Sequence, residues 1–207
     1  MNARLLQQHI GIVRPAETIG LRLFPVVWEA QGGSMERIVL KGGEVLILRR
    51  TLNPGDAGRI VSFHGEVYAR EHGMGPMFEG YVAVTVGEFA QRQGGGNTKE
   101  QALLISREGA AELIGCCAVI DAGDQAAQFR WFLVDTPWRG LGLGRQLLRR
   151  AIEFARTCGY RRVFLYTGDF LPEAAGLYLS EGFILTESHP FAGWELHFTE
   201  QKYELDL

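Results

Sequence analysis

The sequence predicts an α+β domain with a mixed, mostly antiparallel sheet and helices on both of its faces. Three observations lead to this prediction. Segments with the apolar pattern of strands alternate with segments of helical periodicity along the chain. Three strand-like segments in the middle follow one another with short glycine-containing turns, which is typical of an antiparallel meander. An amphipathic helix then precedes a further strand, so helices must cover the sheet.

Turn and cap residues delimit these elements. Asn53-Pro54-Gly55 predicts a turn, and Asp56 is then a candidate helix cap. Gly159 predicts the end of the long amphipathic helix. In order, we expect a strand at 44–51, helices at 56–73 and 78–93, strands at 101–107, 112–121 and 125–135, a helix at 143–158, a strand at 162–167, a helix at 173–180, and strands at 183–188 and 195–205.

Composition excludes several classes of protein. The 207 residues suit one well-buried domain, and the formal net charge of −3 gives no reason to expect nucleic acid or a membrane surface as partner. No apolar stretch has the ~20 residues of a membrane helix, and the first residues do not resemble a signal peptide. Three cysteines, two of them adjacent, form a poor disulfide framework. We therefore expect a cytoplasmic protein without a metal.

Residues 1–43 differ from the rest, and we treat them as an N-terminal extension to a domain at 44–207. They contain one short apolar run, Leu21 to Trp28, and two glycine pairs. Two interpretations stay open: a loosely packed or mobile extension, or a functional arm or added strand. A homodimer built with this segment also stays open.

The segment from Val134 to Arg145 is the most informative part of the chain. A hydrophobic strand enters it, an amphipathic helix leaves it, and glycines stand at 140, 142 and 144. Glycines allow close approach of the backbone, and the N–H groups and dipole of a helix start attract an anion. Arg139 and Arg145 add positive charge, so the loop predicts a diphosphate site.

Two common diphosphate motifs are excluded. A P-loop requires GxxxxGK[ST], and no such lysine follows. A dinucleotide-binding fingerprint requires GxGxxG, but the third position counted from Gly140 is Arg145.

The spacing Arg139-x-x-Gly142-x-Gly144 resembles the R-x-x-G-x-G/A pattern of the GNAT acetyltransferase superfamily. There the pattern binds the pyrophosphate of coenzyme A, so the resemblance implies a GNAT-like sheet and acetyl-CoA as cosubstrate. It also implies strand-like pairing of pantetheine with the preceding strand, which offers a backbone N–H to the thioester carbonyl. The cofactor contacts implied are Leu133, Val134, Asp135, Arg139, Gly140, Leu141, Gly142, Leu143, Gly144 and Arg145.

A second motif supports the resemblance. Residues 174–183 match A-x-x-L-Y-x-x-x-G-F of the family's motif B, whose tyrosine, here Tyr178, implies a general acid for the leaving thiolate. The alternative is a core tyrosine. The family often has an asparagine that contacts the cofactor at the position where this chain has Leu171. The segment 64–73 and the pair Phe78-Glu79 further resemble the acetyltransferase half of MarR–GNAT fusion proteins.

The resemblance leaves the base and the acceptor open. His64, Glu71 and Glu79 fall on helices that wall the acceptor site in this family, and each is a candidate base. Arg130 is a candidate buried partner for one of them. We expect a primary amine acceptor, either a small molecule or a peptide, because these side chains would make a neutral to acidic pocket. The alternative function is a non-catalytic CoA-binding sensor or interaction module.

Overall fold

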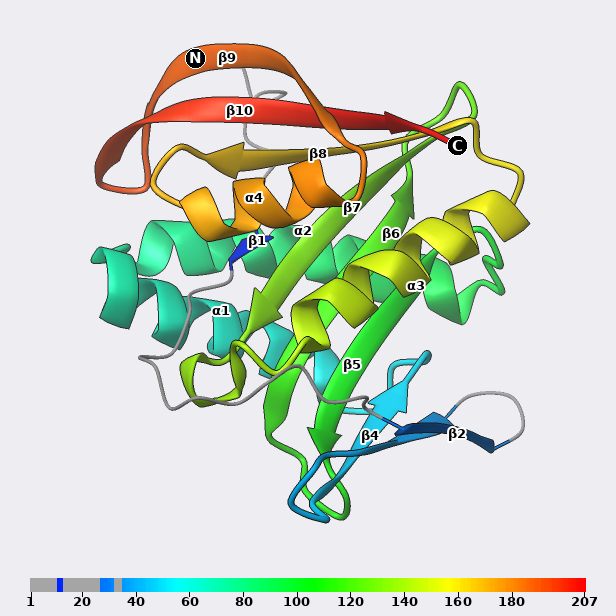
Figure 1. Ribbon diagram of the computed structural model, residues 1–207. Coiled ribbons are helices and arrows are strands. Elements are labelled where there is room, and N and C mark those ends of the chain that lie inside the picture. The colour runs from blue at the N-terminus through cyan, green and yellow to red at the C-terminus, as the bar shows by residue number, and fades with distance from the viewer. Residues whose placement is uncertain (1–10, 13–26, 32–34) are drawn as a thin grey trace.

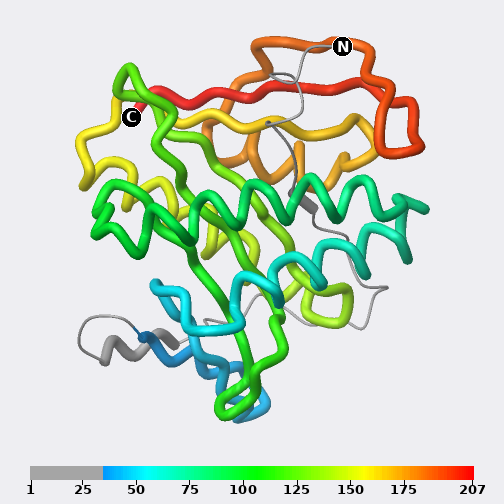
Figure 2. Tube along the Cα trace, turned by 180° about the vertical axis from the view of Figure 1, so that it is seen from behind, coloured from blue at the N-terminus to red at the C-terminus, as the bar shows by residue number. Residues whose placement is uncertain are grey.

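The computed structural model describes residues 11–12, 27–31 and 35–207. One sheet runs through the protein, with α1 and α2 on one face and α3 and α4 on the other (Figures 1 and 2). The α+β prediction is therefore confirmed. The helices are α1 (Asp56–His72), α2 (Pro76–Gly94), α3 (Leu143–Thr157) and α4 (Pro172–Ser180), with a 3-10 turn, η2 (Thr136–Trp138). The strands are β1 (Gly11–Ile12), β2 (Val27–Gln31), β3 (Met35–Val39), β4 (Val45–Arg49), β5 (Gln101–Arg107), β6 (Leu113–Asp121), β7 (Ala126–Val134), β8 (Arg162–Gly168), β9 (Ile184–Gly193) and β10 (Leu196–Asp206).

The strand order is β2-β3-β4-β5-β6-β7-β8-β10-β9, and β1 pairs with β7 outside this path. Neighbours are antiparallel except for the parallel pairs β7–β8 and β1–β7. The predicted meander is confirmed as β5-β6-β7. Helices cover both faces of its centre, so β7 is buried at every position and β6 at all but its last, Asp121.

The strands β7 and β8 pair over only a short stretch. Their register joins Ala126–Gln128 to Arg162–Phe164 and then stops. Further along, the same edge of β7 pairs with β1, with Gly11 opposite Phe132 and Ile12 opposite Leu133. Among the described residues, this edge of β7 beyond its contact with β8 thus pairs with nothing more than the two-residue β1, and we call it the open β7 edge.

A β-bulge precedes this open edge. Ala118 of β6 lies opposite Arg130 and Cys116 opposite Leu133, so β7 contains one extra residue there. Trp131 at the bulge has φ of 49°, an unusual value for a side chain of this size. It is held by hydrogen bonds from Cys116 Sγ to its carbonyl oxygen (3.1 Å) and from its Nε1 to Thr85 Oγ1 (3.1 Å). The bulge is therefore fixed by packing on both sides.

Residues 35–39 belong to the sheet, since β3 pairs with both β2 and β4. Ile38 is fully buried in the core, and Glu36 forms ion pairs with Arg50 and with Arg150 of α3 (2.6 Å to Arg150). The part of the predicted extension from Met35 onward thus includes an added strand. Of the apolar run Leu21 to Trp28, all but Val27 and Trp28 lies outside the described residues.

The predicted cap of α1 was wrong by one residue. Gly55 occupies the cap position with φ of 91°, and it makes no side-chain cap bond. Asp56 is the first residue of the helix, and its carboxylate binds Arg49, Arg59 and the backbone N–H of Asn53. Its charge therefore fastens the β4–α1 connection.

In the described part of the chain, no helix combines the length and the apolar character needed to cross a membrane.

Deleting residues 1–34 should leave a folded domain, because Ile38, Glu36 and the rest of β3 remain. The loss of the two-residue β1 and of the edge pairing with β2 should lower the melting temperature by no more than about 10 °C. Thermal unfolding followed by circular dichroism checks this. A shortened chain without a cooperative transition would show that residues 1–34 pack into the domain or into a dimer.

Candidate functional site

The loop after β7 presents the start of α3. Gly140 and Gly142 have φ of 79° and 82°, values that favour glycine. Gly142 is the N-cap of α3 and offers no side-chain cap. The first bond within the helix runs from the N–H of Gln146 to the carbonyl of Gly142, so the N–H groups of residues 143–145 have no partner inside the helix. Such groups, together with the helix dipole, are able to bind an anion.

The two arginines of the motif have different environments. The Arg139 side chain is fully buried, and it donates from Nε to the Val134 carbonyl (2.7 Å) and from both terminal nitrogens to Glu71 (2.8 and 3.0 Å). Arg145 is about half exposed at the helix start and pairs with Glu181 at 3.2 Å. The sequence predicted two cations for the diphosphate, but only Arg145 is placed at the surface.

Glu71 belongs to this buried cluster. Its carboxylate also accepts a hydrogen bond from Thr136 Oγ1, and Arg70 beside it pairs with Asp135 at 3.2 Å. Burial opposes ionisation of Glu71, but the hydrogen bonds from Arg139 and Thr136 outweigh it and lower the pKa of the carboxyl group. The carboxylate is therefore ionised, and both of its oxygens accept hydrogen bonds from protein groups.

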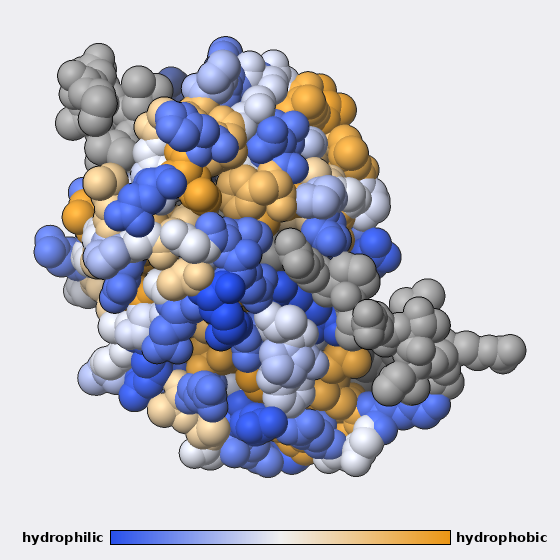
Figure 3. Space-filling view, turned by 90° about the vertical axis from the view of Figure 1, so that its left-hand side faces the viewer, coloured by the Kyte–Doolittle hydropathy of each residue, from blue (hydrophilic) through white to orange (hydrophobic). Residues whose placement is uncertain are grey.

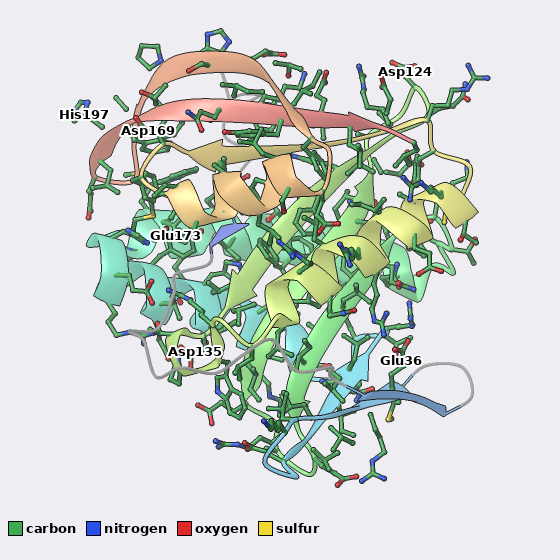
Figure 4. The ribbon with its side chains drawn as sticks, in the orientation of Figure 1. Glu36, Asp124, Asp135, Asp169, Glu173 and His197 are labelled. Atoms are coloured by element: carbon green, nitrogen blue, oxygen red, sulfur yellow. The ribbon has the colours of Figure 1, made fainter. Side chains whose placement is uncertain are left out.

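A cavity of about 360 Å³ lies at this end of β7 and is lined by Arg70, Glu71, Asp135, Thr136, Pro137 and Arg139. Two cationic and two acidic side chains line it, so it is close to neutral. Figure 4 places Asp135 where β7 ends, beside η2. Figure 3 faces this side of the molecule and shows hydrophilic residues gathered in the middle of it.

The predicted pantetheine-binding residues lie at the end of β7. Leu133 pairs with Ile12 of β1, the Val134 carbonyl accepts from Arg139, and Asp135 caps η2 by accepting from the N–H of Thr136. An extended backbone thus already follows the edge where pantetheine is expected. The edge fits an amide-containing chain, and β1 and a cofactor cannot pair with it together.

Tyr178 of α4 is buried among aromatic rings. The ring centroids of Tyr203 and Phe132 lie 5.9 and 6.1 Å from its own. Burial raises its pKa well above the usual value, so the phenol stays protonated and able to donate. The N-terminal strand β1 lies against the same helix. Phe132 lies on β7 opposite Gly11 of β1, so the Tyr178 ring packs on a residue of the open β7 edge.

The other two candidate bases lie in unlike settings. His64 is 1% exposed, its Nδ1 bonds the Ile60 carbonyl at 2.8 Å, and burial lowers its pKa to about 4. Glu79 is exposed on α2, where it packs against Gly65: a Cβ added there would meet its carboxylate oxygen at 2.9 Å. Thus Glu71 is held by hydrogen bonds and an ion pair, His64 is buried, and Glu79 is exposed to solvent.

Two further residues concern the site. Arg130 donates to the Tyr81 hydroxyl, which is none of the three candidate bases. Tyr68 of α1, which sequence reasoning did not single out as a site residue, is fully buried, and its hydroxyl has no hydrogen-bond partner among the described residues. The signal in the sequence that could have identified it is a tyrosine at helical spacing among the apolar residues Ile60 and Val67. Within the same described residues, no group of three or more His, Cys, Asp or Glu side chains is arranged for a metal ion.

Comparisons with known proteins agree with this geometry. The chain is 38% identical over 76 residues to human N-acetyltransferase 8B, a match that covers 35% of this chain and 34% of that protein. The chain thus spans about a third of that relative's length. An N-acetyltransferase from Staphylococcus aureus has the same fold, with a TM-score of 0.61 at 18% identity, over 78% of this chain and 98% of that one.

A protein from Salmonella typhimurium, solved with acetyl-CoA as its cofactor, also shares the fold. Its TM-score is 0.61 at 17% identity, over 78% of this chain and 93% of that one. The model of the acetyltransferase (GNAT) family matches residues 69–183, which include β7, the loop, α3 and α4. The chain belongs to the acetyltransferase (GNAT) family.

Proposed function

We propose that the protein transfers an acetyl group from acetyl-CoA to a primary amine. The observation that supports this most is the continuity of the open β7 edge, the glycine loop and the uncapped start of α3. A long cosubstrate with amides and a diphosphate fits this arrangement, the amides along β7 and the diphosphate at residues 143–145. In this position Arg145 supplies an exposed cation.

In the proposed reaction the amine nitrogen attacks the thioester carbonyl. The carbon–nitrogen bond forms, the carbon–sulfur bond breaks, and the sulfur leaves as a thiolate. The amine must lose one proton to a base, and the thiolate must gain one. The protonated phenol of Tyr178 is the donor that we propose for the sulfur, and backbone N–H groups beyond the Trp131 bulge polarise the carbonyl.

The acceptor is proposed from the charge of the cavity at the end of β7. Its two cations and two carboxylates give no excess of positive charge, which suits an amine better than a ligand dominated by carboxylates. The acceptor is a small molecule or a peptide. Because of residues 64–73 and the pair Phe78-Glu79, we further propose that the chain is related to the acetyltransferase half of MarR–GNAT fusion proteins. Its three free cysteines are the reason that we propose a cytoplasmic location.

Replacing Gly144 with glutamate should weaken acetyl-CoA binding at least tenfold, about 1.4 kcal/mol, because a side chain and a negative charge enter the anion site. Calorimetry measures the affinity. Gly58→Glu is the matched control: it places the same charge in the first turn of α1, where a Cβ meets nothing within 4 Å. Equal affinity of the Gly144 variant and the unmodified chain would refute this placement.

Tyr178→Phe should lower kcat by about a hundredfold while changing acetyl-CoA affinity little, since the hydroxyl acts when charge develops on the sulfur. Tyr203→Phe is the control, because Tyr203 packs on Tyr178 but its hydroxyl bonds Gln201. Steady-state kinetics with the best amine from a panel gives both constants. An unchanged kcat would make Tyr178 a core residue. Binding of acetyl-CoA with no release of thiol for any amine of the panel would favour the non-catalytic CoA-binding alternative.

The pH profile of kcat/KM distinguishes the candidate bases. A base must be unprotonated, so with His64 as base activity rises with pH through about 4 and is flat above. His64→Gln would then remove that limb. If Glu79→Gln removes the rising limb of the kcat/KM profile and His64→Gln does not, Glu79 is the base. A limb that follows the pKa of the amine itself in every variant would show that the enzyme captures amines already neutral in solution.

A further inference from the structure

The ion pair between Arg139 and Glu71 joins two parts of the chain that are 68 residues apart. Glu71 lies in the last turn of α1, one residue before the helix ends. Arg139 begins the glycine loop and also holds the carbonyl of Val134, the last residue of β7. Thr136 between them donates to the same carboxylate. Three interactions therefore hold the turn from β7 to the loop: Arg139 with the Val134 carbonyl, Arg139 with Glu71, and Thr136 with Glu71.

The Arg139 guanidinium is not presented to a ligand. Its side chain is 0% exposed, and each of its three nitrogens donates to a protein acceptor. Turning it outward would leave the Glu71 carboxylate, only 12% exposed, without its main counter-charge. Leaving one partner of a buried ion pair alone is strongly unfavourable. Arg139 thus acts on the loop from within the protein.

Glu71 is equally unavailable as an open base. Both carboxylate oxygens accept from Arg139, and one also accepts from Thr136. These bonds lower its pKa, which weakens it as a proton acceptor. A carboxylate with this environment orients its neighbours.

We propose that Glu71 is a positioning residue that acts through Arg139 to hold the glycine loop against the end of α1. Acetyl-CoA affinity then depends on a carboxylate that does not contact the cosubstrate. The helix that borders the cavity and the loop that binds the diphosphate are fixed to each other by this pair. The inference rests on the proposed function and adds a residue to it.

Glu71→Gln tests the proposal, because it keeps the shape but removes the charge. Calorimetry should show acetyl-CoA affinity falling by about tenfold to a hundredfold, as the loop shifts from its binding position. The pH profile of kcat/KM should keep its shape. The matched control is Glu66→Gln, because Glu66 lies on the same helix but is exposed to solvent. Unchanged affinity would overturn the proposal, and loss of the rising limb with unchanged affinity would make Glu71 the base.

A cycle with Arg139→Gln tests whether the two residues act as a unit. The double variant should bind acetyl-CoA no more weakly than Arg139→Gln alone. Multiplying losses would show independent roles and contradict the proposal. Should Glu71→Gln not fold, Thr136→Val decides: removal of this exposed hydroxyl donor should also weaken binding, and unchanged affinity would overturn the proposal.

Amide hydrogen exchange of the chain without cosubstrate gives a readout separate from binding. Exchange at residues 135–142 should be faster in Glu71→Gln than in the unmodified chain or Glu66→Gln. Equal exchange would contradict the positioning role. An unmodified chain that does not bind acetyl-CoA would contradict the proposed function instead, while this exchange still tests the pair.

Discussion

The buried pair of Arg139 and Glu71 governs how the chain leaves the centre of the sheet. After the bulge at Trp131, β7 ends, the chain turns through η2, and α3 starts with N–H groups that have no partner inside the helix. A guanidinium inside the protein is tolerated only with a counter-charge, and Glu71 from another element supplies it. The end of the open β7 edge and the start of α3 are therefore held close together by this turn. In the function that we propose, diphosphate binding depends on this turn more than on any exposed cation.

Much of the fold was predictable because its strands and helices have regular periodicity and end in glycines. The predicted strand at 101–107 coincides with β5, and α3 ends one residue before its predicted end. The strand β9 was predicted five residues too short, to 188 rather than Gly193. Its turn uses Trp194 and Glu195 at φ of 52° and 67°, without the glycine or asparagine that usually signals such a turn. Trp194 keeps this conformation because its ring is fully buried against Phe191, Tyr81 and Phe78. That is a tertiary contact, which local sequence does not reveal.

The candidate site shows the same division. The glycines at 140 and 142 were identified from their spacing, because positive φ before a helix favours glycine, and glycine is visible in the local sequence. The burial of Arg139 could not be predicted, since its partner Glu71 lies 68 residues earlier in the chain. The settings of His64 and Glu79 likewise follow from helix packing: Gly65 lets α2 approach α1, which places Glu79 beside it. The pairing of β1 with β7 has no local signal at all.

A crystal structure of the full chain with acetyl-CoA tests the central claim most directly. We expect the diphosphate on the backbone N–H groups of residues 143–145 and the pantetheine amides along the β7 edge at residues 132–134. The sulfur should lie near the Tyr178 hydroxyl, and the pairing of Gly11 and Ile12 with β7 should be lost. Acetyl-CoA bound elsewhere, with β1 still paired to Phe132 and Leu133, would contradict the account.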